Sequence, residues 1–349
     1  KNDSTNANNA KLTAKDGAGR TIDVSLATGS SAAFKITGGD GADILTGGSG
    51  ADIISGGNSD DIIIIAAAGH ANSDVIDGGG GTNNVLKLSS GSHSLTTNAN
   101  LQNIKTIDAH ASGSTLDLTN QTENYTINGA GAVDDLTGGG GNDIITGKVG
   151  DDTLKGGAGN DTFNVDSGTD SITDLGGSGA GGESDILKVS GGAIANAINI
   201  KSFTATSDTQ NLGSTTLTAI STGGTINMSS ASGSAIYTII GGAGTDNLKG
   251  DDGNDIIKIV ASTEGNSDTI DGDGGAANTL DVSSGTHVLT DNSKLLNIQN
   301  ITLNNSTINL TNQAEGFKIT GGAGTDNITG GSGDDIIIVS AAGQANSDT

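Results

Sequence analysis

A nine-residue pattern recurs along this chain: Gly-Gly-x-Gly-x-Asp-x-apolar-x, where x is any residue. Ten stretches fit it wholly or nearly so, in back-to-back runs such as GGDGADILT from Gly38 followed by GGSGADIIS from Gly47. Runs at a fixed spacing are far more specific than an isolated motif, because every copy must form the same unit and stack on its neighbours. The runs span residues 38–64, 129–164, 241–258 and 321–338.

Each nonapeptide predicts a six-residue turn followed by a three-residue strand. Glycines permit the positive φ angles of tight turns, and alternate strand residues face opposite sides of the strand. We therefore predict an all-β fold, a parallel β-roll or β-solenoid in which two nonapeptides complete one coil and position eight points into the core. The position-eight residues are Leu45, Ile54, Ile63, Ile145, Leu154, Phe163, Leu248, Ile257, Ile328 and Ile337.

The aspartate at position six stands where each turn becomes a strand. Turn carbonyls and a carboxylate from two stacked turns can together supply the roughly six to eight oxygen ligands that Ca²⁺ prefers. A flexible Gly/Asp-rich linker is the alternative, but random low complexity would not keep the apolar residues in register through four runs. The pattern therefore predicts a fold wound around Ca²⁺.

These residues resemble the RTX family, the calcium-binding repeat of Gram-negative proteins exported by type I secretion. The resemblance implies that backbone carbonyls of the first four turn positions and the aspartate at position six bind calcium. Carried over to this sequence, the metal-binding residues are Gly39, Gly41, Asp43, Gly48, Gly50, Asp52, Gly57, Ser59, Asp61, Gly139, Gly141, Asp143, Gly150, Asp152, Gly157, Gly159, Asp161, Gly242, Gly244, Asp246, Asp251, Gly253, Asp255, Gly322, Gly324, Asp326, Gly331, Gly333 and Asp335.

Three departures from the family pattern affect this set. Lys148 replaces a turn glycine and brings a positive charge near the ion, whereas Asp251 replaces a glycine but adds an acceptor. Ala132 makes the copy that begins at Gly129 degenerate, so Asp134 is a weaker candidate ligand.

Turns on the same side of the solenoid lie two repeats apart in the sequence. The turn at Gly47 should therefore stack on the wide loop that ends in Asp74, and the turn at Gly250 should face the region of Gly272 across the loop that ends in Asp268. These loop aspartates are either secondary ligands or ordinary capping residues. The secondary ligand candidates are Asp74, Asp268 and Asp348.

Composition limits the partners and the core. The net charge is -25, which argues against nucleic acid because phosphates would be repelled. Only four of the 40 acidic residues are Glu, and the excess of Asp fits short turn ligands. With 2% aromatic residues and no Trp, a thick globular core is excluded, but a solenoid can stack a thin apolar ladder. No apolar run is long enough to predict a membrane span.

The segments between the runs also repeat. Residues 1–37, 65–128, 165–240 and 259–320 alternate apolar and polar residues, and four aligned pieces pass through an aromatic residue into a nonapeptide run. We interpret them as further strands with wider loops, so residues 1–349 are predicted to form one continuous repeat solenoid, an excerpt of a longer chain. The aromatic residues are Phe34, Tyr125, Tyr237 and Phe317.

Catalytic motifs are missing from the sequence. There is no HExxH, no GxSxG, no Cys and no phosphate-binding loop followed by a helix. His93 and His287 occupy one equivalent repeat position, which favours a structural role, and carboxylate pairs such as Asp60–Asp61 belong to repeated turns rather than to a glycosidase site. We therefore expect that the chain is not an enzyme.

The long Thr/Ala/Asn/Gly-rich strand ladders between short runs, with their Leu-x-Asn-Ile pieces, resemble bacterial S-layer proteins of the RTX type. The resemblance implies a structural, calcium-dependent S-layer subunit on the extracellular surface of a Gram-negative bacterium. Its expected partners are other copies of itself through calcium, cell-surface polysaccharide and the type I secretion apparatus. Two alternatives stay open: the extender region of an RTX adhesin, and the calcium-folded secretion tail of an exported enzyme or toxin.

Overall fold

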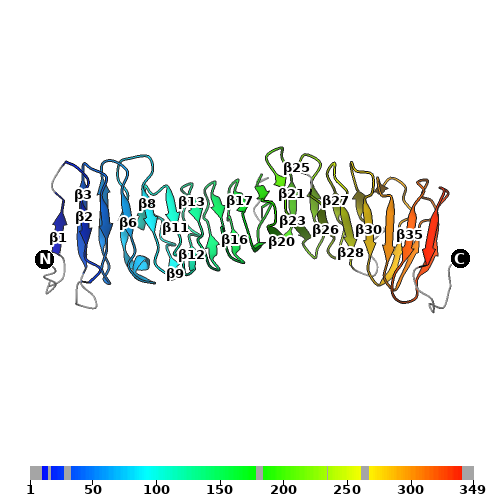
Figure 1. Cartoon of the computed structure of the whole chain (residues 1–349), viewed down its shortest axis with the longest axis horizontal. Helices are drawn as coiled ribbons and strands as arrows, with labels where there is room; N and C mark the ends of the chain where they lie inside the picture. Colours follow the sequence, from blue (N-terminus) through cyan, green and yellow to red (C-terminus); the bar gives the residue numbers. More distant parts are fainter. Residues whose placement is uncertain are drawn as a thin grey trace. The chain divides into compact units, whose positions relative to one another are not determined.

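The computed structural model describes residues 10–14, 17–26, 33–177, 184–233, 235–260 and 267–339. The chain divides into two compact units, residues 1–171 and 172–349. Each unit consists of short strands joined by turns, and the strands pair in parallel with those of the next coil (Figure 1). The predicted all-β parallel solenoid is thereby confirmed.

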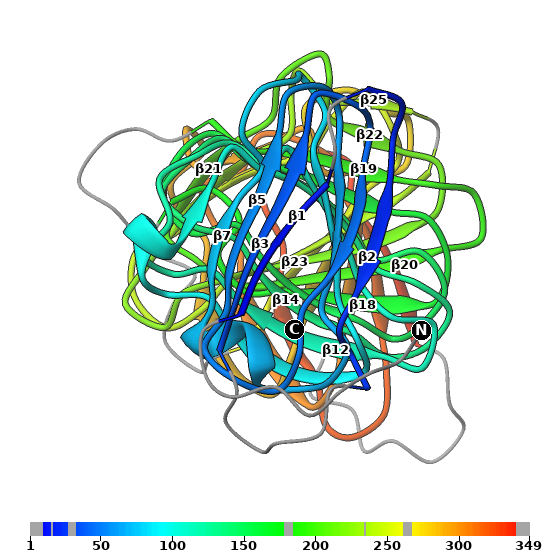
Figure 2. The same cartoon turned by 90° about the vertical axis from the view of Figure 1, so that its left-hand side faces the viewer.

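The first coils of unit 1 have two walls (Figure 2). One wall contains β1 (Ala10–Thr13), β3 (Phe34–Gly39), β5 (Ile53–Gly57), β7 (Val75–Asp77) and β10 (Leu101–Gln102). The facing wall contains β2 (Thr21–Asp23), β4 (Ile44–Thr46), β6 (Ile62–Ile64), β8 (Val85–Lys87), β11 (Thr106–Asp108), β13 (Thr126–Asn128), β15 (Ile144–Thr146) and β17 (Thr162–Val165). A third wall begins further along, with β9 (Gly91–Ser94), β12 (Ser114–Asp117), β14 (Asp135–Thr137), β16 (Thr153–Lys155) and β18 (Thr169–Ile172).

Unit 2 is built from parallel ladders of the same kind. The largest contains β20 (Ile194–Ile200), β23 (Ser214–Ala219), β26 (Tyr237–Ile240), β28 (Ile256–Ile259), β30 (Thr279–Val282), β33 (Asn300–Leu303), β35 (Lys318–Gly321) and β37 (Ile336–Val339). A second contains β21 (Ser202–Thr204), β24 (Thr225–Asn227), β27 (Asn247–Lys249), β29 (Thr269–Asp271) and β32 (Leu295–Leu296). Shorter ladders pair β19 (Ile186–Val189), β22 (Gln210–Asn211) and β25 (Ser232–Gly233), and also β31 (Gly285–Val288), β34 (Ser306–Asn309) and β36 (Asn327–Thr329).

The register follows from the nine-residue period. Ile36 lies beside Ile54, and Leu45 beside Ile63, so that strand partners are two nonapeptides apart. Each coil therefore places its position-eight side chain directly on that of the next coil, which buries both. Two short 3₁₀ helices interrupt the strands of unit 1, η1 (His70–Ser73) and η2 (Asn98–Asn100). No helix within the described part of the chain has the length and apolar character needed to cross a membrane.

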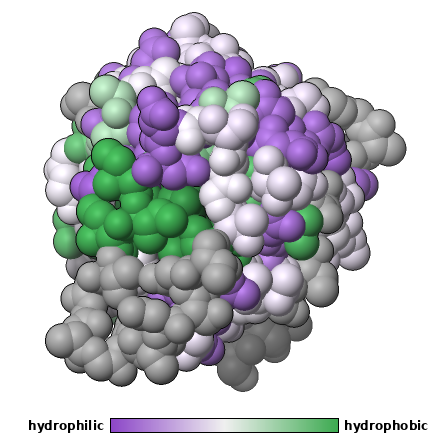
Figure 3. All heavy atoms as spheres, turned by 90° about the vertical axis from the view of Figure 1, so that its right-hand side faces the viewer, coloured by the Kyte–Doolittle hydropathy of each residue, from purple (hydrophilic) through white to green (hydrophobic). Residues whose placement is uncertain are grey.

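The core is a thin stack of apolar side chains. The position-eight residues are 0–1% exposed, with one exception: Ile337 in β37 is 44% exposed. No described coil stacks on β37, so this predicted core residue is left partly exposed, together with Ile336 and Ile338. Figure 3 shows an apolar surface on the face that it presents. The four aromatic residues that lead into the runs are all buried.

The two repeat-equivalent histidines are structural parts of this core. His93 and His287 are at most 1% exposed, and their Nε2 atoms lie 3.0 and 3.2 Å from the carbonyl oxygens of Ser89 and Ser283. Burial lowers the pKa of both imidazoles, because an apolar setting disfavours the charged form.

Candidate calcium sites

The position-six aspartates form hydrogen-bonded ladders that run from coil to coil. The Oδ1 atom of Asp61 accepts the backbone N–H of Asp43 at 2.8 Å, one coil earlier, and Asp161 accepts that of Asp143 at 2.8 Å. Parallel stacking at the 18-residue spacing brings each carboxylate beside the preceding backbone. We call these columns the aspartate ladders; they are Arg20–Asp43–Asp61–Asn84, Phe34–Asp52–Asp74, Ser114–Asp134–Asp152–Asp170, Tyr125–Asp143–Asp161, Gly224–Asp246–Asp268, Tyr237–Asp255–Asn278, Ser306–Asp326 and Phe317–Asp335.

The second carboxylate oxygen, Oδ2, points into the turn. In Asp52, Asp143 and Asp335 it accepts the backbone N–H of the residue four positions earlier, at 2.7–3.0 Å. In a second group this oxygen is buried and has no hydrogen-bond partner among the described residues. A buried, unpaired carboxylate oxygen is costly, so these atoms indicate a missing positive partner. The group comprises Asp43, Asp61, Asp152, Asp170, Asp246 and Asp326.

The first glycine of the turn forms a cradle beside this oxygen. A Cβ added at Gly38 would lie within 3.0 Å of both Asp43 Oδ2 and the carbonyl oxygen of Gly56, which is the first glycine of the next coil. At Gly147 two unpaired carboxylate oxygens, from Asp152 and Asp170, approach the same point. Oxygens that converge without a donor between them would repel one another, and a hard cation bound there would remove the repulsion. The donor set therefore fits Ca²⁺.

The electrostatics of the ladders support the same assignment. Burial, together with the neighbouring carboxylates of Asp52 and Asp152 respectively, raises the pKa of Asp74 and of Asp170 to about 7. Burial also raises the pKa of Asp255 to about 6. Without a counter-charge the ionised form is disfavoured at these positions, and a divalent ion would restore it.

Main-chain oxygens would supply most ligands at each site. The described residues contain no group of three or more His, Cys, Asp or Glu side chains arranged to hold a metal. At position two of the turns, the carbonyls of Gly39 and Gly139 accept N–H groups of the next coil at 2.6 and 2.8 Å. Position one also contributes a carbonyl near a carboxylate, because the Gly56 carbonyl oxygen and Asp43 Oδ2 would both lie close to a Cβ added at Gly38.

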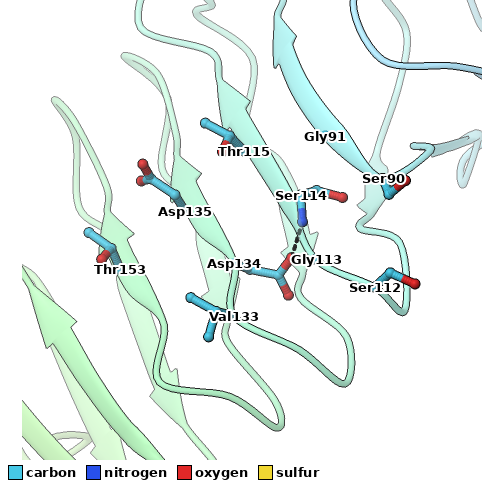
Figure 4. Close-up of a pocket in the computed structure, with 10 residues that line it drawn as sticks. All are labelled: Ser90, Gly91, Ser112, Gly113, Ser114, Thr115, Val133, Asp134, Asp135 and Thr153. Atoms are coloured by element: carbon cyan, nitrogen blue, oxygen red, sulfur yellow. Dashed lines mark hydrogen bonds between the residues drawn. The ribbon is translucent and has the colours of Figure 1, made fainter.

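The three departures from the pattern have distinct outcomes. Lys148 adopts a positive φ of 68°, whereas the glycines at the same turn position have a φ of 125° in Gly39 and 107° in Gly157. Asp251 donates its backbone N–H to Asp255 Oδ2 at 2.8 Å. Asp134, the weaker candidate, is buried in a ladder, and its Oδ1 accepts the N–H of Ser114 at 2.7 Å, as Figure 4 shows.

Asp74 lies beside the turn at Gly47, as the stacking predicted, and Asp268 lies beside the turn at Gly241. Asp74 accepts the N–H of Asp52 at 2.8 Å, and Asp268 accepts that of Asp246 at 2.9 Å. Asp348 lies outside the described residues. Sequence reasoning missed Asp170, although its position 18 residues after Asp152 was a usable signal. It also missed Asn84 and Asn278, which continue two ladders without a carboxylate.

Comparison with known families gives one match. The model of the RTX calcium-binding nonapeptide repeat matches in four copies, at residues 36–64, 126–172, 238–258 and 318–341. No curated protein and no solved structure matches the chain.

Proposed function

Because the chain carries four blocks of RTX calcium-binding repeats, whose proteins are typically secreted, we propose that it forms a calcium-dependent structural part of a bacterial cell-surface protein. In this proposal the protein is a self-assembling S-layer subunit, is exported by type I secretion and has no catalytic activity. The supporting observation is that aspartate ladders recur in each of the two units, each between coils of parallel strands. Calcium would then rigidify a scaffold along its length.

The charge of the protein suggests how the subunits associate. At a net charge of -25, neighbouring molecules repel one another at low salt. Some turn carboxylates face solvent, among them Asp40, Asp151 and Asp252. Calcium held between such carboxylates of adjacent molecules would reverse the repulsion, whereas sodium would only screen it.

Light scattering of the intact protein tests this proposal. We expect side-by-side association in calcium, dissociation in EDTA, and poor substitution by sodium chloride at matched ionic strength. Electron microscopy of the calcium-loaded sample should then show two-dimensional sheets.

Two other results would point elsewhere. Open parallel coils suit a spacer as well as a lattice, so a protein that folds with calcium but stays monomeric at high concentration would favour the adhesin extender. Refolding with calcium of an attached hydrolase or toxin domain would favour the secretion tail. Binding to isolated cell-surface polysaccharide would test the proposed anchor.

A further inference from the structure

Two turns of the solenoid carry asparagine where the ladders otherwise carry aspartate. Asn84 in unit 1 and Asn278 in unit 2 are at most 2% exposed. Their Oδ1 atoms accept the N–H groups of Asp61 and Asp255, each at 2.8 Å, in the same way as the ladder aspartates do. Both turns are one residue longer than a nonapeptide turn, in GGGGTNN from Gly78 and GDGGAAN from Gly272.

The asparagine Nδ2 atom occupies the place of the aspartate Oδ2. A Cβ added at Gly78 would lie within 3.0 Å of Asn84 Nδ2 and of the carbonyl oxygen of Asn103. In the same way, a Cβ added at Gly38 would lie within 3.0 Å of Asp43 Oδ2 and of the carbonyl oxygen of Gly56. The orientation of the amide is set by its partners, because the N–H of Asp61 requires an oxygen at δ1. The nitrogen must therefore face the turn.

In this place the neutral amide supplies hydrogen-bond donors, which the turns with an unpaired Oδ2 lack. Asn84 Nδ2 donates to the carbonyl oxygens of Gly80 and Asn103 at 2.8 and 2.9 Å. Asn278 Nδ2 donates to those of Gly272 and Asn297, both at 3.0 Å. These carbonyls come from two successive coils, the same kind of donor set that would hold calcium in the aspartate turns.

The arrangement occurs independently in both units. Asn103 and Asn297 each have a φ of 55°, and each donates its side-chain amide to an aspartate, Asp77 or Asp271, at 2.7 Å. Each asparagine turn also follows the last aspartate of its ladder, Asp61 or Asp255. The asparagines therefore end the run of carboxylates in their ladders, and in unit 2 the N–H of Asn278 is accepted in turn by Gln299 Oε1 at 2.8 Å.

We propose that Asn84 and Asn278 close two aspartate ladders by replacing the calcium ion with their own side-chain amide. These two turns bind no calcium, and a single exchange of nitrogen for oxygen converts a closed turn into a calcium site. The inference rests on the proposal that calcium occupies the aspartate turns. It goes further by identifying two turns that do not bind the ion.

Calcium content per chain tests the inference, by equilibrium dialysis and elemental analysis of the parent and of Asn84→Asp. We expect about one further calcium ion in the variant, because an oxygen would then face the Gly80 and Asn103 carbonyls. The calcium concentration needed for folding, followed by circular dichroism, should also rise. Asn83→Asp is the matched control: it adds the same charge at the exposed neighbouring position and should add no ion.

The converse substitution, Asp61→Asn, places an amide in a calcium turn and should remove about one ion while the protein still folds. Asn278→Asp with control Ala277→Asp repeats the test in unit 2, should Asn84→Asp fail to fold. Unchanged calcium content in folded Asn84→Asp or Asn278→Asp, or an equal gain in the controls, would overturn the inference. A parent that binds no calcium would instead contradict the calcium sites themselves.

Discussion

The run at residues 129–164 and the run at residues 321–338 share one motif but differ in completeness. In the first, Asp143 and Asp152 are each 1% exposed, and described coils stack on both sides of their turns. In the second, Asp326 is 8% exposed, and its described ladder bond runs only to Ser306, on one side. The motif therefore provides half of a site, and the stacked neighbour provides the rest.

Calcium removal should have the largest effect. We expect excess EDTA to convert the β-rich protein largely and reversibly to coil, because unpaired carboxylates then line the turns. With sites of ~10⁻⁴ to 10⁻³ M affinity, as in extracellular calcium modules, hydrogen exchange at limiting calcium should protect residues 129–164 before residues 321–338. An unchanged circular dichroism spectrum in EDTA would contradict the prediction that calcium is needed for folding. If the amides of both runs became protected at the same calcium concentration, the predicted difference between the runs would be wrong.

The second largest difference between the two runs should appear when one carboxylate is removed from each. Asp143→Ala leaves the N–H groups of Tyr125 and Gly139 without their acceptor, at an expected cost of roughly 3 kcal/mol. Asp326→Ala frees only the N–H of Ser306 among the bonds described, so about 1 kcal/mol is expected.

Urea unfolding in saturating calcium measures these costs, and titration calorimetry measures the calcium lost. Asp135→Ala serves as the control, because this exposed aspartate lies next to the ladder but outside it. Equal effects of Asp143→Ala and Asp326→Ala would refute the role of the stacked neighbour.

The two runs also differ in the space available beside the first glycine of the turn. A Cβ at Gly138 would lie within 3.0 Å of Asp143 Oδ2 and the Gly156 carbonyl, whereas the nearest atom to one at Gly321 is Asp326 Oδ2 at 3.1 Å. Gly138→Ala should cost about 1–3 kcal/mol through overpacking and should weaken calcium binding, and Gly321→Ala should cost less. Thermal unfolding at several calcium concentrations would show the difference, and the reverse order would argue against the cradle.

The smallest expected effect comes from the histidines outside the ladders. Burial holds the pKa of His93 below its ordinary value of 6.5, so the unfolded chain takes up a proton first as the pH falls. His93 should therefore lower stability as the pH drops below 6.5, by at most about 1.4 kcal/mol per pH unit. His93→Gln keeps a donor for the Ser89 carbonyl and should reduce this slope in urea unfolding at constant calcium saturation. An identical slope would show that His93 does not titrate differently on folding.

The sequence by itself determined the coil and most of the ladder. A period of nine with an apolar residue at position eight specifies which side chains are buried, and the two-repeat offset specifies which turns stack, as for Asp43 and Asp61. The wide loops obscure this period, because the ladder partners Asp52 and Asp74 are 22 residues apart and the partners Asp61 and Asn84 are 23 residues apart. Even so, the offset correctly placed Asp74 beside the turn at Gly47 and the region of Gly272 beside the turn at Gly250.

Only the tertiary structure decided how each ladder position is satisfied. Aspartate and asparagine have nearly the same shape, so from the repeat pattern alone Asn84 would be interpreted as a degenerate copy of the position that Asp43 occupies. What separates them is the surroundings: the carbonyl oxygens around Asn84 already have a donor, whereas Asp43 Oδ2 has none. Such a distinction arises from oxygens that distant residues bring together across successive coils, and local sequence does not encode where those oxygens point.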